Sequence, residues 1–445
     1  MNRKLVILGG GESGAGAAVL GRLKGYDVFV SDAGPIRDSY KKELEEYNVP
    51  YEEEKHTEER ILEADEVMKS PGIPHNNEMV QKIVAKGIPL VSEIELAYRY
   101  KGNGKIIGIT GSNGKTTTTS LIYHICKEGG VDCALVGNIG NSFARQVALA
   151  PVEWYVAEIS SFQLDDIHEF RPDIAVLTNI TEDHLDRYDY QFENYIRAKF
   201  NIVKNQSVSD YFIYCEDDPV TVENLKRFPF LSNPLPFTMN RELPKGAYIS
   251  SSLMTVQTAD KLSMSIYDFA LKGKHNQYNT MAACVAASVI GIRKEKIRDA
   301  VMNFETLEHR METVSTVRGV EFINDSKATN VNSTWFALES MTKPVILILG
   351  GVDKGNDYSL LMDLVKEKVK AIVCLGADNT KLHKAFGNEV EVIVNTSSAK
   401  EAVKASFHLA SKGDVVLLSP ACASFDLFNN YEDRGKQFKN AVKEL

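Results

Sequence analysis

A short glycine-rich stretch with a lysine and several hydroxyl groups occupies residues 110–117, which read Thr-Gly-Ser-Asn-Gly-Lys-Thr-Thr. It follows an apolar run at 105–109 and precedes a helical pattern at 118–127. Backbone N–H groups in such a turn point inward, and the next helix N-terminus adds positive potential, so phosphate oxygens can bind there. Lys115 can reach the β- and γ-phosphates, and the Thr116 hydroxyl can bind Mg²⁺. These features predict an ATP site.

The ATP-binding residues predicted in this stretch are Gly111, Ser112, Asn113, Gly114, Lys115, Thr116 and Thr117. The spacing departs from the strict phosphate-loop pattern, because the stretch between Gly108 and Gly114 is one residue longer. A chance glycine-lysine pairing is the alternative interpretation. The apolar run before the turn and the helical pattern after it favour the phosphate loop.

Three further side chains, those of Glu158, His184 and Lys199, could determine which group accepts the γ-phosphate. Glu158 ends the apolar run 154–157, and His184 lies just past another apolar run at 174–177. Carboxyl ends of parallel strands meet at one edge of a sheet, so both side chains should lie over the phosphate loop, with Glu158 placed as a metal ligand. The alternative is that both are solvated loop residues. Lys199, in a helical stretch, is by itself typical of a surface lysine.

A second glycine turn at residues 9–14, Gly-Gly-Gly-Glu-Ser-Gly, fits the dinucleotide-binding pattern, and Asp32 ends the next strand. Taken alone, this turn suggests NAD bound through its ribose hydroxyls. Helix N-termini bind anions in general, however, so another diphosphate is the alternative. The ATP loop further along the chain favours that alternative, since few dehydrogenases carry both.

The rhythm of strands and helices predicts an α/β protein of three domains. Strands at 5–8, 27–30 and 66–68 alternate with helices, which indicates a Rossmann-like N-terminal domain over residues 1–93. A central parallel sheet resembling that of phosphate-loop ATPases, with a small antiparallel appendage near 262–269, should fill 94–304. Strands at 320–323, 345–349, 371–374, 391–394 and 415–418 predict a Rossmann-like C-terminal domain over 305–445.

Composition narrows the functional class. The 445 residues carry a net charge of −9, which argues against a sequence-independent nucleic-acid binder. The six cysteines are scattered without metal-ligand spacing, as in proteins of a reducing compartment. The apolar run at the N-terminus is too short for a signal peptide, and we expect no membrane span. We expect a cytoplasmic protein that acts as a monomer.

Eight motifs together resemble the Mur ligase family of peptidoglycan synthesis, over essentially the whole chain. They lie at residues 110–117, 158–163, 178–184, 198–199, 273–276, 307–310, 324–330 and 419–426. Residues 324–330, 419–424 and 434–438 are similar to the branch that adds D-glutamate, and the Asp-Asn-Pro-Arg signature of the diaminopimelate- or lysine-adding relative is absent. The resemblance implies amide formation between the L-alanine carboxylate of UDP-N-acetylmuramoyl-L-alanine and the amine of D-glutamate, through an acyl phosphate.

The resemblance also assigns roles to residues of the central and C-terminal domains. It implies two Mg²⁺ ions held by Thr116, Glu158, His184 and a carbamate on Lys199, with Lys115 beside them in catalysis. Further ATP contacts are implied for Asn276, Arg310 and Asp325. D-Glutamate contacts are implied for Lys327, Thr329, Lys354, Ser424 and Phe425, although the order of residues around Lys354 departs from the commoner one.

The UDP substrate takes the first glycine turn in this family. The implied contacts are Glu12, Ser13, Asp32, Ala33 and Gly72 in the N-terminal domain, and Asn138, Ser160, Gln163 and His184 in the central domain. Position 34 is glycine, so no basic side chain stands there for the diphosphate, and Arg37 could substitute.

Three alternatives remain open at this point. An NAD-dependent oxidoreductase would use the first glycine turn but leave the ATP loop idle. A catalytically silent UDP-sugar sensor would have no use for Lys115, Thr116 and Lys199 together. A ligase resembling folylpolyglutamate synthetase would share the ATP core but not the first turn.

Overall fold

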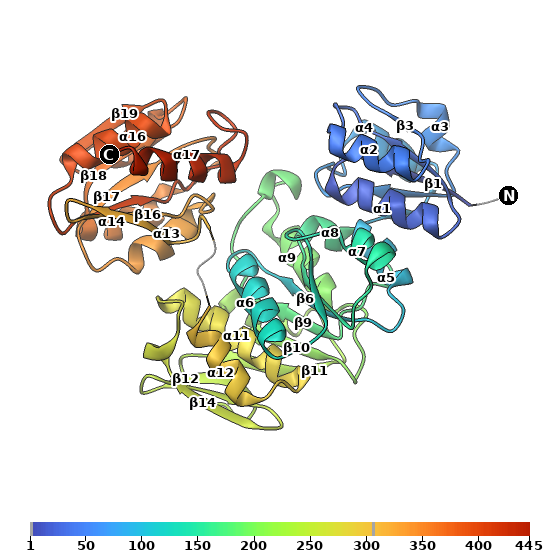
Figure 1. Ribbon diagram of the computed structural model, residues 1–445, viewed down its shortest axis with the longest axis horizontal. Coiled ribbons are helices and arrows are strands. Elements are labelled where there is room, and N and C mark those ends of the chain that lie inside the picture. Colours follow the sequence, from blue (N-terminus) through green and yellow to red (C-terminus); the bar gives the residue numbers. More distant parts are fainter. Residues whose placement is uncertain (1–2, 305–307) are drawn as a thin grey trace. The chain divides into compact units, whose positions relative to one another are not determined.

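The computed structural model describes residues 3–304 and 308–445 and divides the chain into two compact units (Figure 1). The first unit comprises Met1–Phe269 and Asn276–Phe304, and the second comprises Ala270–His275 and Glu305–Leu445. Each unit is built on parallel-dominated sheets covered by helices. The predicted boundary at residue 305 and Leu307 of the predicted motif lie outside the described residues.

The first sheet has the strand order β3-β2-β1-β4-β5, with every pair parallel. Its strands are β1 (Lys4–Leu8), β2 (Asp27–Ser31), β3 (Tyr51–Glu52), β4 (Glu66–Lys69) and β5 (Leu90–Val91). The helices between them are α1 (Glu12–Leu23), α2 (Asp38–Glu46), α3 (Glu58–Leu62) and α4 (Glu78–Ala85). The chain order reverses at β1, and ligands of open α/β sheets bind at such a switch point.

The second sheet, also in the first unit, has the order β14-β13-β12-β11-β10-β9-β6-β8-β7. Its parallel strands are β6 (Lys105–Thr110), β7 (Cys133–Gly137), β8 (Trp154–Glu158), β9 (Ile174–Leu177), β10 (Tyr211–Cys215), β11 (Asn233–Thr238) and β12 (Gly246–Ser250). Strand β6 lies between β9 and β8, so the predicted ATP loop follows the strand at which the chain order reverses.

Helices surround this second sheet and connect its strands. They are α5 (Glu93–Tyr100), α6 (Lys115–Glu128), α7 (Phe143–Leu149), α8 (Ser161–Asp165), α9 (Phe192–Phe200), α10 (Pro219–Asn224), α11 (Lys274–Ile290) and α12 (Lys294–Met302). The predicted helical pattern at 118–127 therefore begins earlier than expected, directly at Lys115 of the ATP loop.

The predicted antiparallel appendage extends the second sheet and does not form a separate one. Strands β13 (Leu253–Gln257) and β14 (Lys261–Ser265) are antiparallel, and β12 joins them to β11. Strand β11 contains Pro234 and Pro236, which obscured it in the sequence. Only Phe237 and Thr238 pair with β12, so the prolines occupy a half-strand with a neighbour on one side, where the missing N–H is tolerated.

The third sheet belongs to the second unit and has the order β15-β16-β20-β17-β18-β19. Its parallel strands are β16 (Val320–Asn324), β17 (Val345–Leu349), β18 (Val369–Leu375), β19 (Val392–Thr396) and β20 (Val415–Leu418), and β15 (Glu312–Val317) is antiparallel at the edge. Helices α13 (Val331–Glu339), α14 (Met362–Lys368), α15 (Thr380–Phe386), α16 (Ala399–Leu409) and α17 (Tyr431–Lys443) connect the strands. The three-domain α/β prediction is confirmed.

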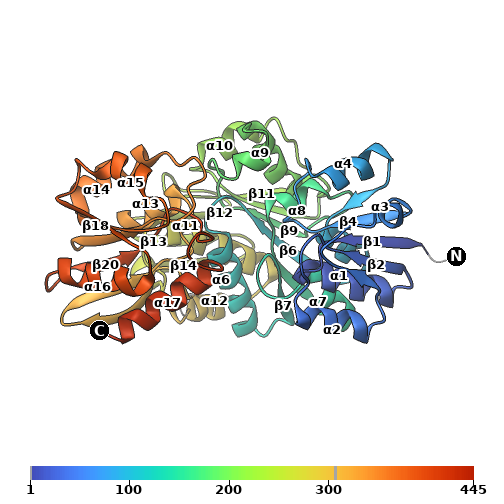
Figure 2. The same cartoon turned by 90° about the horizontal axis from the view of Figure 1, so that it is seen from above.

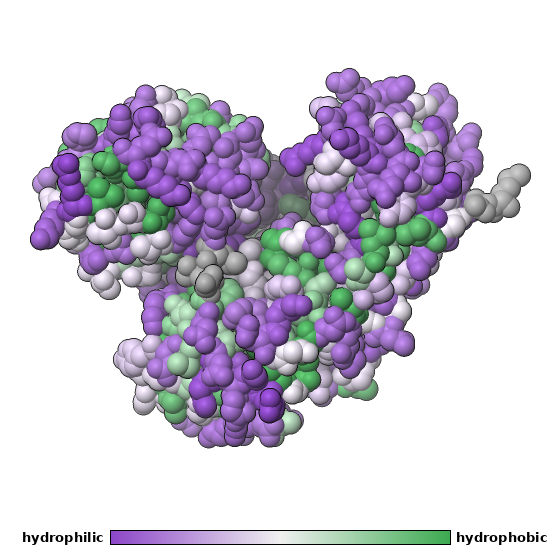
Figure 3. Space-filling model, viewed as in Figure 1, coloured by the Kyte–Doolittle hydropathy of each residue, from purple (hydrophilic) through white to green (hydrophobic). Residues whose placement is uncertain are grey.

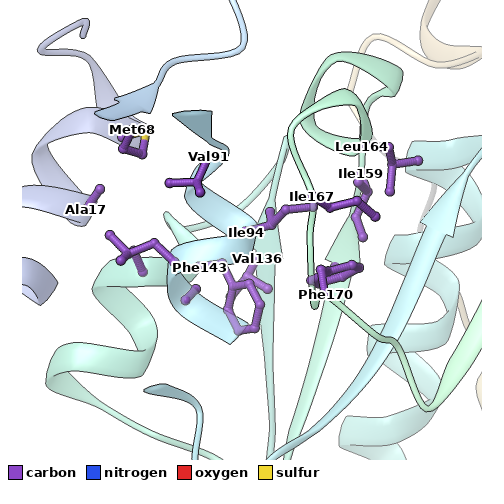
Figure 4. Close-up of a cluster of buried hydrophobic side chains, with 14 of the residues drawn as sticks. Ala17, Met68, Val91, Ile94, Val136, Phe143, Ile159, Leu164, Ile167 and Phe170 are labelled. Carbon is purple, nitrogen blue, oxygen red and sulfur yellow. The ribbon is translucent and has the colours of Figure 1, made fainter. Parts of the chain in front are cut away.

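The first two sheets share one hydrophobic core, which explains why they form a single unit. Helix α7 packs against both α1 and α5, and Figure 2 shows α1 and α7 side by side. The close-up of Figure 4 labels Ala17 of α1, Met68 of β4, Ile94 of α5 and Phe143 of α7, which belong to one cluster of buried side chains. These side chains are fully buried, so hydrophobic burial connects the two domains.

The surface in Figure 3 is mostly hydrophilic, with smaller apolar patches. Within residues 3–304 and 308–445, no helix has the length and apolar character needed to cross a bilayer.

Candidate active site

Two glycines shape the loop between β6 and α6. Gly111 has φ +143° and Gly114 has φ +80°, which disfavour any residue with a side chain. A Cβ atom at Gly111 would lie 1.9 Å from Thr178 Oγ1, and one at Gly114 would lie 2.3 Å from Asn279 Oδ1. Both glycines are therefore required by backbone conformation and by close packing, as a phosphate cradle demands.

The segment after β9 holds this loop in shape. Thr178 Oγ1 donates to the Asn113 carbonyl at 2.6 Å, and the Asn113 N–H donates to Asn179 Oδ1 at 3.0 Å. The Ser112 N–H donates to the Asn179 carbonyl at 2.9 Å. The sequence placed Thr178 and Asn179 in a predicted motif but did not predict that they support this loop. Their position directly after the strand next to β6 was the feature that could have indicated this role.

The side chain of Lys115 folds back onto the loop that precedes it. Its Nζ donates to the carbonyls of Gly111 and Ser112 at 2.7 and 2.8 Å. Thr116 and Thr117 lie in the first turn of α6, whose unpaired N–H groups give that end a positive potential. Asn276 is buried in α11 and accepts from Asn279 Nδ2 at 3.1 Å, which places it beside the loop.

Glu158 occupies the end of β8, next to the strand that leads into the loop, with Ile109 as its partner in the ladder. Its side chain is buried, and Oε1 accepts from Asn138 Nδ2 at 2.8 Å. Oε2 is buried and has no hydrogen-bond partner within the described residues. A buried carboxylate oxygen without a donor is costly unless a cation or ligand compensates it.

Lys199 is not the surface lysine that its local sequence suggests. It is 1 % exposed, and its Nζ donates to Thr110 Oγ1 at 3.3 Å and lies 5.0 Å from the Tyr195 ring centroid. Burial and the nearby charge of Lys115 lower the pKa of Lys199 well below its ordinary value, and the carboxylates of Asp183, Asp165 and Glu158 only partly oppose this. The surroundings of Lys199 therefore favour the neutral amine more than water does.

His184 stands in a strained turn, with φ +53°. The backbone N–H of His184 donates to Asp183 Oδ1 at 2.9 Å. Its ring packs edge-on to the Phe162 ring, with 5.1 Å between the ring centroids. No group of three His, Cys, Asp or Glu side chains within the described residues is arranged to hold a metal ion. The four predicted metal ligands do not require such a group, because only Glu158 and His184 among them are of these residue types.

A cavity of about 390 Å³ lies at the switch point of the first sheet. Its wall contains every substrate residue predicted in this domain, namely Glu12, Ser13, Asp32, Ala33 and Gly72, and also His56, Ser70 and Asn77, which sequence reasoning missed. A neighbouring hollow of about 340 Å³ is lined by Arg37 and Tyr40. Arg37, the predicted substitute for the missing basic group near Gly34, lines this neighbouring hollow and not the first cavity.

The two carboxylates in the wall of this cavity, Asp32 and Glu12, accept hydrogen bonds from protein groups. Asp32 accepts from the N–H groups of Gly10 and Gly34 at 2.6 and 2.8 Å, so it shapes the glycine turn. Glu12 accepts from the Ser142 N–H at 2.9 Å and pairs with Arg145. The pairing with Arg145 reduces the repulsion that Glu12 would exert on a bound diphosphate.

The remaining predicted substrate residues lie on the second sheet. Asn138 contacts Glu158, as described above, and Ser160 and Gln163 form a reciprocal capping box at the start of α8. Ser160 and Gln163 therefore have a structural role in the helix start, beside the Phe162 ring that supports His184.

Further contacts tie the wall of the cavity to the elements around the second sheet. Lys69, at the end of β4, forms a buried ion pair with Asp166 at 3.1 Å. Arg187, three residues after His184, donates to the carbonyls of Pro71 and Gly72 at 3.1 and 3.4 Å. The structure thus connects the cavity wall to the loop that carries His184.

The residues predicted to contact D-glutamate lie after strands β16, β17 and β20 of the third sheet. The Lys327 ammonium lies 3.8 Å from the Tyr431 ring centroid. Ser424 is buried, whereas Phe425 is 71 % exposed and Lys354 is exposed. Asp353 shapes the turn before Lys354 by accepting from the Gly355 N–H at 2.8 Å. Carboxyl ends of parallel strands are the usual place for a ligand in such a sheet.

Two residues predicted to contact the nucleotide also belong to the second unit. Asp325 is buried, and its Oδ2 accepts from Ser419 Oγ at 2.9 Å. Burial raises the pKa of Asp325 to about 7, against the smaller effects of the Ser419 bond and the Arg310 charge. Arg310 is half-buried.

Models of known protein families match three parts of the chain. The MurD N-terminal domain matches residues 4–79, the Mur ligase middle domain matches 109–287, and the Mur ligase glutamate ligase domain matches 309–422.

Curated relatives match over the full length. A protein of Christiangramia forsetii named UDP-N-acetylmuramoylalanine--D-glutamate ligase is 54% identical over 446 residues, which cover 100% of both chains. A protein of Bacteroides fragilis with the same name is 52% identical over 444 residues, again covering 100% of both. These matches favour neither an oxidoreductase nor a folylpolyglutamate synthetase.

Solved structures share the fold at low sequence identity. A pseudomurein peptide ligase type C from Methanothermus fervidus has a TM-score of 0.63 at 20% identity and 100% coverage of both chains. The UDP-N-acetylmuramate-alanine ligase of Thermotoga maritima has a TM-score of 0.62 at 16% identity and 99% coverage of both. With the full-length identities above, the chain belongs to the Mur ligase family, among relatives named UDP-N-acetylmuramoylalanine--D-glutamate ligase.

Proposed function

We propose that this chain is an ATP-dependent ligase that joins the L-alanine carboxylate of UDP-N-acetylmuramoyl-L-alanine to the amine of D-glutamate, in peptidoglycan precursor synthesis. The full-length identity to relatives with this name carries the proposal. The loop at Gly111–Gly114 with Lys115 above it supports the use of ATP.

A carboxylate is a poor electrophile, so the reaction needs activation. In the proposed mechanism the alanine carboxylate attacks the γ-phosphate, ADP leaves, and the D-glutamate amine attacks the acyl phosphate and releases inorganic phosphate. The N–H groups of the loop and Lys115 hold the phosphates and spread the charge that develops on them. The protein therefore aligns its substrates and compensates the negative charge of the phosphates, and no side chain acts as a nucleophile.

We propose two Mg²⁺ ions held by Thr116, Glu158, His184 and a carbamate on Lys199. The unpaired Oε2 of buried Glu158 fits a cation ligand. Bound Mg²⁺ would neutralise phosphate charge during transfer.

The carbamate proposal is supported by the surroundings of Lys199. A neutral amine can attack CO₂, forming an N–C bond and releasing one proton, whereas an ammonium cannot. Burial and the charge of Lys115 lower the pKa of Lys199 well below its ordinary value, which favours the neutral form that this reaction needs. The product is an anion, which would be attracted to a divalent cation where the ammonium would be repelled.

Substrate positions follow the same assignments. The cavity with Glu12, Ser13, Asp32, Ala33 and Gly72 would take the UDP moiety. Asn138, Ser160, Gln163 and His184 would face the muramoyl end. Asn276, Arg310 and Asp325 would contact ATP. Lys327, Thr329, Lys354, Ser424 and Phe425 would take D-glutamate, whose two carboxylates suit two lysines.

We further propose that the protein is a cytoplasmic monomer. All six cysteines are free and buried, as in proteins of a reducing compartment. Sedimentation of the purified chain tests the oligomeric state, and we expect the mass of a single chain.

Phosphate release tests the substrates directly. With ATP, Mg²⁺ and UDP-N-acetylmuramoyl-L-alanine, D-glutamate should trigger turnover, and L-glutamate and D-alanine should not. Turnover with L-glutamate and a folate, without the UDP-sugar, would instead identify a ligase related to folylpolyglutamate synthetase.

Oxygen-18 in the alanine carboxylate tests the mechanism. An acyl phosphate requires one labelled oxygen to pass into the released phosphate, and phosphate without label would exclude that intermediate.

A further inference from the structure

Arg434 is a fully buried cation in the second unit. The residue, in the first turns of α17, is 1 % exposed, and α17 packs against β16 (Figure 1). No carboxylate lies within ion-pairing distance of the Arg434 guanidinium within residues 308–445. Burial lowers its pKa to about 10, so the guanidinium stays charged at neutral pH.

The hydrogen bonds of Arg434 reach three different loops. Nε and Nη2 donate to the hydroxyl and carbonyl of Ser326 at 3.0 and 2.8 Å. Nη1 donates to the carbonyls of Gly350 and Cys422 at 3.4 and 3.2 Å. These loops follow β16, β17 and β20.

The same three loops carry the side chains assigned to D-glutamate. Ser326 precedes Lys327, Gly350 begins the loop of Lys354, and Cys422 lies two residues before Ser424. A neutral, well-packed side chain would often stabilise such a site more than a buried charge does. Burial lowers the pKa of Arg434 more than the carboxylates of Asp426 and Asp325 raise it, so these carboxylates do not fully compensate the buried charge, and an anionic substrate would add to that compensation.

We propose that Arg434 is a positioning residue for the dianionic amino-acid substrate, which it serves by bracing the three loops and by adding positive potential beneath them. The proposal rests on the proposed function and deepens it. It predicts a defect specific to D-glutamate, because the hydrogen bonds of Arg434 go to the three loops that carry the side chains assigned to that substrate.

Three full-length variants test the proposal in the phosphate-release assay. Arg434→Met removes the charge and keeps much of the volume, Arg434→Lys keeps the charge with fewer donors, and Lys436→Met removes an exposed charge from the same helix as a control. We expect the KM for D-glutamate to rise about thirtyfold in Arg434→Met and about fivefold in Arg434→Lys. The KM values for ATP and the UDP-sugar should stay within about twofold, as should all KM values of Lys436→Met.

Several results would overturn the proposal. They are an unchanged KM for D-glutamate in Arg434→Met, an equal rise in the KM for every substrate, or an Arg434→Lys variant as impaired as Arg434→Met. If Arg434→Met does not fold, Ser326→Ala replaces it, because it removes one acceptor and leaves the charge. We then expect a rise of about threefold in the KM for D-glutamate alone, and an unchanged KM overturns the bracing role.

The wild-type enzyme separates this proposal from the proposed function. Whether D-glutamate is the substrate is decided by wild-type turnover with the amino-acid panel. The role of Arg434 is decided by the variants, measured with whichever dianionic amino acid the wild type accepts.

Discussion

Lys199 is the residue at which local sequence and tertiary structure differ most. A lysine within a short amphipathic helix is usually solvated. Here α9 turns Lys199 toward Thr110 at the end of β6, where its amine is buried beside the phosphate loop. Only the packing of α9 on the sheet reveals this, and no periodicity in the sequence does. The family resemblance located the residue because it carried information about tertiary structure.

Replacing Lys199 should separate stability from activity. Lys199→Met removes a buried amine, so we expect it to raise the free energy of unfolding by about 1 kcal/mol in buffer without Mg²⁺ and CO₂, and to lower kcat by about 10³-fold or more. Because the folded-state pKa is lowered, wild-type stability rises with pH between that pKa and the ordinary value of 10.5, and the variant should lack this rise. Urea unfolding at several pH values measures it.

The exposed Lys204, just after α9, provides a matched control. Lys204→Met should leave both turnover and the pH dependence of stability unchanged. Full turnover in Lys199→Met would contradict the carbamate.

Asp325 should give the opposite pH dependence. Its pKa is raised from 3.8 to about 7, so the folded chain holds more protons than the unfolded chain between these values. The free energy of unfolding should therefore fall as pH rises through this window, by about 2–4 kcal/mol from this group. Asp325→Asn should flatten the slope. Trp335 fluorescence, in a Trp154→Phe background, reports on the second unit during urea unfolding, and an unchanged slope would contradict the raised pKa.

At the scale of elements, the long buried strands were predictable and the short or unusual ones were not. Strands β17 and β20 occupy the residues predicted, because continuous apolar runs specify fully buried parallel strands. The two-residue strands β3 and β5 have too few residues for a pattern. The edge strand β15 has no fully buried residue in its burial pattern, so it lacks the alternation that marks a strand.

The segment after β9 offers a test of loop support. Thr178→Val keeps the shape of the side chain but removes the hydroxyl that donates to the Asn113 carbonyl. We expect a loss of about 1 kcal/mol, which is about a fivefold rise in the KM for ATP. Thr178→Ser keeps the hydroxyl and should behave nearly as the wild type. If Thr178→Ser raises the KM and Thr178→Val does not, packing of the methyl group and not the hydrogen bond supports the loop.

The ion pair between β4 and α8 offers a second test at this scale. Burial raises the pKa of Asp166, but the bond from His75 and the charge of Lys69 outweigh it and hold the pKa below its ordinary value. Lys69→Met should destabilise the chain by about 3 kcal/mol and weaken binding of the UDP-sugar, because the cavity wall follows β4 directly. Lys69→Met with Asp166→Leu should cost less than the sum of the single changes.

The control for this cycle is Lys42→Met on the exposed face of α2. Additive effects of the Lys69 and Asp166 changes would mean that the pair makes no mutual contribution. Denaturant unfolding and calorimetric titration with the UDP-sugar measure the two effects.

At the scale of the whole molecule, the sequence predicted residues in each part of the candidate site but not the contacts that support them. Motifs identified the glycine turns, Glu158 and His184, because those residue types carry chemistry. Some of the contacts that hold them, such as those from Arg187 to the carbonyls of Pro71 and Gly72, join residues more than a hundred positions apart. Such contacts depend on how the first two sheets pack, which local patterns do not contain.

In the first unit, the proposed sites for the UDP-sugar and for ATP belong to different sheets. The cavity proposed for the UDP-sugar is lined by residues of the first sheet and the loops that follow its strands, and the proposed phosphate loop follows β6 of the second. Lys115→Ala should therefore lower kcat by about 10³-fold and leave the Kd for the UDP-sugar within about twofold, as calorimetric titration would measure. Lys127→Ala, an exposed lysine on the same helix, should change neither quantity. A parallel loss of UDP-sugar binding in Lys115→Ala would mean that the phosphate loop also shapes the cavity, so that the sheets do not act as separate sites.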